Sequence, residues 1–101
     1  MIARIWQGSV KAADFEAYTE FMKSRAIPDY QSTPGFVRLQ FLRRMDGDTG
    51  HFTLITYWEN LAVIKHFAGE DYEKAKYYPE DQQYLLHFAE KVVHHELFAE
   101  G

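Results

Sequence analysis

The alternation of apolar and polar residues along the chain predicts its first strand and its first helix. Residues Met1 to Gln7 alternate, with Ile2, Arg4 and Trp6 on one face, as in a β-strand. Gly8 and Ser9 are expected to turn the chain. From about Lys11, apolar residues then recur at spacings of three and four, which predicts an amphipathic helix to about Ala26. Pro28 is expected to end this helix, because proline disfavours helical geometry at the residue before it.

Two strands joined by a hairpin are predicted in the middle of the chain. The first runs from Phe36 to Arg44 and is partly apolar on both faces. One face carries Val37, Leu39 and Phe41, and the other carries Phe36 and Leu42. The loop from Met45 to Gly50 is rich in Asp and Gly, which is typical of a hairpin. The second strand, His51 to Trp58, is dense in aromatic and β-branched residues and is expected to pair antiparallel with the first.

Two short helices and a last strand are predicted in the remaining sequence. Asn60 is a good N-cap for a helix whose apolar stripe is Leu61, Ile64, Phe67 and Ala68, and Gly69 ends that helix. Pro79 begins a second short helix that runs to about Leu86, with acidic residues in its first turn. The segment from Ala89 to Phe98 is expected to form the last strand.

This order of elements predicts a ferredoxin-like βαββαβ fold of the α+β class, with an antiparallel sheet and helices on one face. Residues 1–101 form a single domain in this interpretation. The strand Phe36 to Arg44 is partly apolar on both faces, and a few short helices can cover only one of them. We therefore expect a homodimer in which a second sheet covers the other face.

Composition excludes several classes of function. The formal net charge is −4 and the basic residues are scattered, which argues against a nucleic-acid surface. No stretch approaches the ~20 apolar residues that span a bilayer, and no secretion signal precedes the first strand, so we expect no membrane partner. The absence of cysteine fits a reducing compartment, and the cytoplasm is the expected location.

The candidate chemistry rests on aromatic residues. The five histidines show no metal-ligand spacing, no serine lies in a nucleophile motif, and the glycines form no phosphate loop. We therefore expect neither a metal nor a tightly bound cofactor. Aromatic content is high at 17%, and one group of rings and histidines is a candidate ligand pocket. Its members are Trp6, Trp58, Phe67, Tyr72, Tyr77, Tyr78, His66 and His94. The alternative is that these rings fill the core and an interface.

The stretch TYWENLAVIKHFAGEDYEKAKYYPEDQQYLL, the later VVHHE and the opening MIARIW resemble the antibiotic biosynthesis monooxygenase superfamily. The segment FAGEDYEKAKYYPED is similar to a branch of small proteins in that superfamily. The resemblance implies a dimeric α+β barrel, with a cleft between sheet and helices in each subunit. It also implies one of two activities, which are oxidative haem degradation and cofactor-independent oxygenation of phenols or quinols.

The residues favour the second activity. By resemblance, Tyr77 stands where the haem-degrading branch has an axial histidine, Phe67 where it has a tryptophan, and Arg4 or Gln7 near its asparagine. Cofactor-independent oxygenation needs only a proton-handling group and aromatic walls around a small aromatic ligand. We expect His94 to be the base, unless its strand face is the dimer face. Tyr72 and Tyr77 are the other expected catalytic residues. The expected substrate contacts are Trp6, Arg4, His66, Phe67 and Tyr78. The alternative function is a non-catalytic dimeric protein that binds a small molecule or haem, or is associated with stress.

Overall fold

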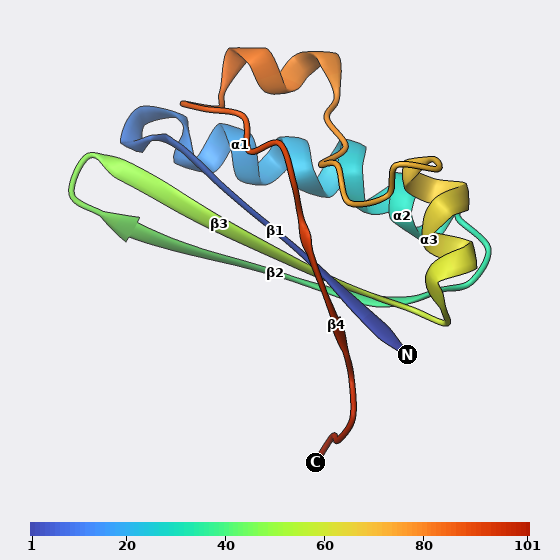
Figure 1. The fold of residues 1–101 in the computed structure, drawn as a ribbon. Helices are drawn as coiled ribbons and strands as arrows, with labels where there is room; N and C mark the ends of the chain where they lie inside the picture. The colour runs from blue at the N-terminus through green and yellow to red at the C-terminus, as the bar shows by residue number, and fades with distance from the viewer.

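A computed structural model describes all 101 residues and shows a four-stranded antiparallel sheet with helical segments on one face (Figure 1). The strands lie in the order β2-β3-β1-β4. The expected ferredoxin-like α+β fold is therefore confirmed. The strands are β1 (Ile2–Lys11), β2 (Phe36–Asp46), β3 (Thr49–Trp58) and β4 (Val93–Glu96). The helical segments are η1 (Ala12–Asp14), α1 (Phe15–Phe21), η2 (Met22–Ala26), α2 (Ile27–Gln31), α3 (Leu61–Ala68) and η3 (Pro79–Gln83).

Strand β1 continues past the point where a turn was expected. Gly8 and Ser9 pair with Phe52 and His51 of β3, and the pairing extends to Lys11. Gly8 leaves room for the Trp6 ring, which packs over it on the same strand. A Cβ atom at this position would lie 2.2 Å from the nearest ring carbon of Trp6, so only glycine lets the indole lie along the strand. The prediction of a turn at Gly8 and Ser9 was therefore wrong.

The first helical stretch also runs further than predicted. It begins as the 3-10 turn η1 and continues through α1, the π-helical turn η2 and α2 to Gln31. Pro28 lies in the first turn of α2, directly after the wide π-helical turn. A proline is tolerated in a first turn because its missing N–H leaves no helical hydrogen bond unmade there. Pro28 thus begins a helical segment and does not end one.

Strand β2 contains a bulge that changes which side chains share a face. The register with β3 shifts between Phe36 and Arg38, which leaves Val37 as the extra residue. Phe36 consequently packs on the core together with Leu39 and Phe41, while Val37 is exposed. The predicted grouping of Val37 with Leu39 and Phe41 was wrong. The expected hairpin is confirmed, and its turn uses Gly47 at φ +59°.

The C-terminal half keeps its predicted order with shorter elements. The Asn60 side chain accepts a hydrogen bond from the Val63 N–H at 3.1 Å and caps α3, as expected. Gly69 ends α3 at φ +93°. The helix from Pro79 ends at Gln83. The last strand is confined to Val93–Glu96, because the backbone of residues 90–92 forms hydrogen bonds with the loop at residues 73–75. Ala75 N–H donates to Glu90 O at 2.9 Å, and Val92 N–H donates to Glu73 O at 2.8 Å.

The core lies between the sheet and the helical segments. Tyr30 stacks on Phe67 with ring centroids 4.6 Å apart, and Trp58 packs on Phe67 at 5.1 Å. The opposite sheet face has no cover within the chain, and Leu42 and Val93 are exposed on it. No helix is long and apolar enough to cross a membrane. The buried cluster consists of Trp6, Val10, Tyr18, Met22, Ala26, Tyr30, Phe52, Leu54, Trp58, Ile64, Phe67, Tyr78, Leu85 and Val92.

Candidate functional site

The centre of the candidate site is a buried arginine that has no carboxylate partner. Arg4 lies on the helix-facing side of β1 and is only 3% exposed. Its Nη1 donates to the carbonyl oxygen of Tyr72, and its Nη2 donates to that of Lys74 at 3.0 Å. Its Nη1 also lies 3.0 Å from Nε2 of His94. No acidic side chain is within ion-pair distance of Arg4, so its three hydrogen-bond partners are all neutral and leave its charge uncompensated.

The contact with Arg4 determines the protonation state of His94. A guanidinium has no acceptor, so the Nε2 atom of His94 must accept the hydrogen bond and cannot carry a proton. The imidazole is therefore neutral, with its proton assigned to Nδ1. Burial lowers the pKa of His94 below its ordinary value, and the charge of Arg4 lowers it further. The Nδ1–H group then has no acceptor within the chain.

The register of β4 places His94 at the site. His94 pairs with Arg4 on β1, so its side chain lies on the helix-facing side of the sheet, away from the open face. The ring of Tyr72 meets the His94 ring edge-on, with centroids 5.3 Å apart. Both rings belong to segments that are far apart in sequence. The structure therefore brings together Arg4, Tyr72 and His94.

Trp6 and Tyr77 form a second pair beside this group. The indole N–H of Trp6 donates to the Tyr77 hydroxyl at 3.2 Å, and that hydroxyl donates to the carbonyl oxygen of Ala89 at 2.6 Å. Burial raises the pKa of Tyr77. A phenol whose proton is already engaged and whose pKa is raised is poorly suited to proton transfer at neutral pH. Tyr77 instead connects β1 to the segment that leads into β4.

Tyr78 belongs to a polar cluster with Asp29 and Lys76. Its hydroxyl donates to Oδ2 of Asp29 at 2.6 Å, and the same oxygen accepts from Lys76 Nζ at 3.0 Å. Burial raises the pKa of Tyr78. Phe67 lies in the core beneath Lys76, whose Nζ is 4.0 Å from the ring centroid. His66 is exposed on α3 and contacts none of these side chains, so the structure does not bring His66 to the site.

The single cleft that the sequence predicted is two separate spaces. Trp6, Tyr77 and Tyr78 line a cavity of only about 20 Å³, which is nearly filled by side chains. Tyr72 and His94 line an open depression of about 390 Å³ beside β4. Of these two spaces, only the depression has the volume of a small-molecule site. Its lining residues are Ile2, Leu61, Tyr72, Glu73, Val92, Val93, His94, His95 and Glu96.

Sequence reasoning missed the buried role of Asp81. This residue was expected to be a charge at a helix start, and it does cap η3, with Oδ2 accepting from the Tyr78 N–H at 2.7 Å. It is also only 2% exposed, and its Oδ1 accepts from the Tyr18 hydroxyl at 2.9 Å. Burial raises the pKa of Asp81. The sequence signal was its position two residues after Pro79, which marks a capping carboxylate, but nothing local indicated Tyr18.

The residues do not fit a haem group. Tyr77 stands at the position that the resemblance gives to the axial ligand, but its hydroxyl is bound to Trp6 and Ala89. Burial raises its pKa, which disfavours a tyrosinate ligand. The space next to it is about 20 Å³. No cluster of three or more histidine or acidic side chains is placed to hold a metal ion.

Comparison with known proteins identifies the fold. No family model and no curated protein matches the sequence. Among solved structures, a Nitrosomonas europaea protein described as an antibiotic biosynthesis monooxygenase matches 98% of this chain and 100% of its own, with a TM-score of 0.70 and 18% identity. The haem degrader MhuD from Mycobacterium tuberculosis, with two haems bound, matches 100% of this chain and 99% of its own, with a TM-score of 0.68 and 18% identity.

A third match is the ActVA-Orf6 monooxygenase of Streptomyces coelicolor in complex with nanaomycin D. It covers 98% of this chain and 88% of its own, with a TM-score of 0.62 and 16% identity. The chain therefore has the fold of the antibiotic biosynthesis monooxygenases, and the resemblance found in the sequence is confirmed at the level of the fold. At these identities the likeness concerns the fold alone.

Proposed function

We propose that this protein is a member of the antibiotic biosynthesis monooxygenase superfamily and a cofactor-independent monooxygenase that oxidises an electron-rich phenol or quinol with O₂. The observation that carries the proposal is the uncompensated charge of Arg4 directly behind His94. Such a reaction requires the phenol to react as its phenolate. A buried cation without a carboxylate partner stabilises an added negative charge nearby.

The depression beside β4 holds the aromatic ring of the substrate against Tyr72. The Nδ1–H group of His94 donates a hydrogen bond to the substrate oxygen, and Arg4 polarises the imidazole from the other side. Both effects lower the pKa of the phenol, and its proton passes to water because the depression is open to solvent. His94 thus acts as a hydrogen-bond donor, a different role from the base expected from the sequence, because its Nε2 lone pair is already used by Arg4.

The chemical balance requires only O₂ as co-reactant. The phenolate gives one electron to O₂, and the resulting phenoxyl radical and superoxide combine at a ring carbon that carries hydrogen. The peroxide anion that forms takes up a proton, and the resulting hydroperoxide loses water together with the ring hydrogen, which leaves a quinone carbonyl at that carbon. One oxygen atom enters the product and the other leaves as water. The protein supplies phenolate stabilisation and a ring-binding surface.

Oxygen consumption with dihydroxynaphthalene-type and anthrone-type substrates tests this function. Replacing a preorganised donor at a developing oxyanion typically costs about 10²- to 10³-fold in rate. Arg4 acts on the substrate oxygen through His94, so we expect a smaller loss in Arg4→Gln, which removes the charge. Arg4→Lys, which keeps the charge, is expected to retain more activity.

The matched control is His66→Gln, because His66 is exposed on α3 and contacts none of the side chains at the site. Its activity is expected to equal that of the wild type, whereas His94→Gln loses activity. Equal rates in wild type and Arg4→Gln would exclude the role given to Arg4. Binding of these phenols without oxygen consumption would favour the non-catalytic binding protein.

A homodimer and a cytoplasmic location complete the proposal. The open sheet face carries Leu42 and Val93 exposed, with Ile5 and Ile55 half-buried between them. An apolar sheet face of this kind is stable in water when a second sheet covers it, and the same face of a second copy is the partner we propose. The absence of cysteine fits the reducing cytoplasm.

A further inference from the structure

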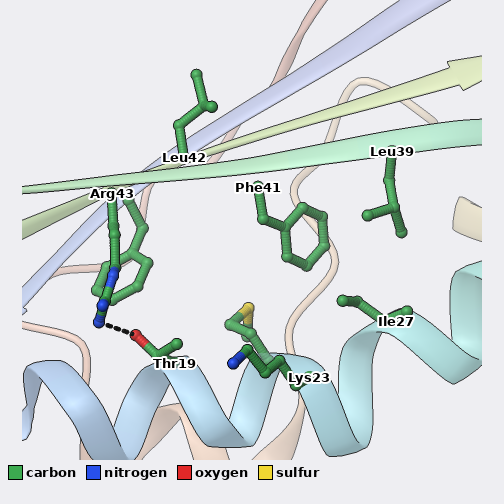
Figure 2. A pocket seen from close by; sticks show the side chains of 9 residues that line it. Thr19, Lys23, Ile27, Leu39, Phe41, Leu42 and Arg43 are labelled. Carbon is green, nitrogen blue, oxygen red and sulfur yellow. Dashed lines mark hydrogen bonds between the residues drawn. The ribbon is translucent and has the colours of Figure 1, made fainter.

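A second hollow lies between the first helical stretch and β2 (Figure 2). Its volume is about 350 Å³, which is within the range of small-molecule pockets. We call it the β2 groove. It shares none of its lining residues with the depression beside β4. Its lining residues are Thr19, Met22, Lys23, Ile27, Leu39, Phe41, Leu42, Arg43 and Phe52.

The groove is long and narrow because two regular rows of side chains form its walls. One row occupies every second position of β2, from Leu39 to Arg43, and the four residue steps between these positions span about 13 Å. The other row occupies every fourth position of the helical stretch, from Thr19 to Ile27, and the eight residue steps between these positions span about 12 Å. Figure 2 shows the two rows facing each other, while Leu42 points to the other side of the strand. The matched lengths make a channel that suits an extended molecule.

Polarity changes along the channel. Ile27 and Leu39 lie at one end, and Thr19 and Arg43 lie at the other, with Lys23 along the rim (Figure 2). Phe41 and Phe52 supply an apolar wall over the length between the ends. No acidic residue lines the groove. The groove is therefore complementary to a molecule with an apolar body and one anionic end.

The cationic side chains at the polar end, Arg43 and Lys23, keep N–H donors that have no partner in the chain. Arg43 uses only Nη1, which donates to Oε1 of Glu16 at 2.9 Å and to Oγ1 of Thr19 at 3.0 Å, so its Nε and Nη2 groups have no partner in the chain. Lys23 has only a 3.6 Å pair with Glu20, and both side chains of that pair are exposed. Exposed pairs of this kind contribute little. An incoming carboxylate can therefore accept from Arg43 and attract Lys23.

We propose that the β2 groove is a binding site for a medium-chain carboxylate. The carboxylate accepts hydrogen bonds from Arg43, and the alkyl chain lies along Phe41 toward Ile27 and Leu39. This site is separate from the oxygenation site at Arg4 and His94, and its occupancy does not depend on turnover. The chemistry that selects the ligand is one negative charge at the end of an apolar chain.

Titration of the full-length protein with decanoate, at concentrations below micelle formation, tests the site by calorimetry and by amide chemical shifts. We expect shifts in residues 19–27 and 39–43. Decanol and decyltrimethylammonium have the same chain without the negative charge, and both are expected to bind at least about tenfold more weakly, the factor for one lost charge-assisted hydrogen bond.

Two controls separate the charge of Arg43 from its ion pair. Arg43→Gln is expected to weaken decanoate binding at least about tenfold. Glu16→Gln breaks the same ion pair but keeps the cation, so it is expected to bind decanoate as tightly as the wild type or more tightly. Arg44→Gln removes the neighbouring exposed cation on the other face of β2 and is expected to change nothing.

Filling the channel gives an independent measurement. Leu39→Trp places a larger ring at the apolar end, and we expect it to abolish decanoate binding while thermal unfolding shows a folded protein. The proposal is overturned if decanoate and decanol bind equally well, or if Arg43→Gln and Arg44→Gln bind alike. It is also overturned if the chemical shifts change at Tyr72 and His94 and not along the groove.

Discussion

The protonation state of His94 predicts how the stability of the protein depends on pH. Burial lowers the pKa of His94 in the folded chain, the charge of Arg4 lowers it further, and the nearby Glu73 acts in the opposite direction. In the unfolded chain this imidazole titrates at about 6.5. Between the folded pKa and about 6.5, the unfolded chain therefore binds more protons than the folded one. Stability must rise with pH across this window.

The size of the effect follows from the proton count. One proton of difference changes the free energy of unfolding by at most about 1.4 kcal/mol per pH unit. The contribution of His94 is complete above about pH 6.5, decreases as the pH falls, and stops changing below the folded pKa. Because His94 is only half-buried, solvent screening keeps the total change smaller than that of a fully buried imidazole.

Urea unfolding from pH 8 to pH 5, at one fixed protein concentration, measures this contribution. His94→Gln keeps an acceptor for Arg4 but cannot titrate, so its unfolding free energy is expected to fall less steeply below pH 6.5 than that of the wild type. A difference between wild type and His94→Gln that stays constant from pH 8 to pH 5 would show that the folded pKa is not lowered.

Three further outcomes follow from the structure. Tyr18→Phe removes the donor to the buried Oδ1 of Asp81 and is expected to lower the unfolding free energy by about 1–3 kcal/mol. Tyr84→Phe is the control, and equal stability of the two variants would contradict the hydrogen bond assigned between Tyr18 and Asp81. Gly8→Val drives a Cβ into the Trp6 ring and is expected to destabilise by about 1–3 kcal/mol, with a changed tryptophan emission, and a variant as stable as the wild type would refute this packing. Sedimentation is expected to show a dimer that Val93→Glu shifts toward monomer, and a monomeric wild type at micromolar concentration would exclude the proposed face-to-face pairing.

The parts of the fold that the sequence predicted are those determined by local chemistry. The Asn60 cap, the Gly69 end of α3 and the Gly47 hairpin each depend on residues within one turn of each other. The errors arose where contacts between segments that are distant in sequence determine the local structure. Gly8 looks like a turn residue, but the space it leaves is filled by the Trp6 ring, and β1 continues because β3 pairs with it.

The bulge in β2 shows the same limit of local reasoning. The alternation of Val37, Leu39 and Phe41 is perfect in the sequence, yet the register with β3 shifts beside Val37 and brings Phe36 to the core. A bulge of one residue reverses the face of everything on one side of it. Its position is determined by pairing with β3, which no periodicity in β2 contains.

The candidate site was predictable as a set of residue types but not as a set of bonds. Trp6, Tyr72, Tyr77 and His94 were all expected at one cleft, but the structure pairs Trp6 with Tyr77 and Tyr72 with His94, and the two pairs line separate spaces. The role of Arg4 was not visible, because two of its three acceptors are backbone carbonyls and carry no residue signature. Nor could the spacing show that Arg4 takes the Nε2 lone pair of His94.

Arg4 also explains why the same position matters to both fold and chemistry. Its hydrogen bonds join β1 to the loop around Tyr72 and to β4, but neutral donors could make those bonds at a lower cost of desolvation. What a neutral side chain cannot supply is the charge, and within the chain no carboxylate uses it. A buried cation retained without a partner is most useful when a negative charge arrives with a ligand, and the deprotonated oxygen of a phenol supplies one beside His94. The binding of an anionic oxygen beside His94 would therefore offset part of the desolvation free energy that is lost when Arg4 is buried.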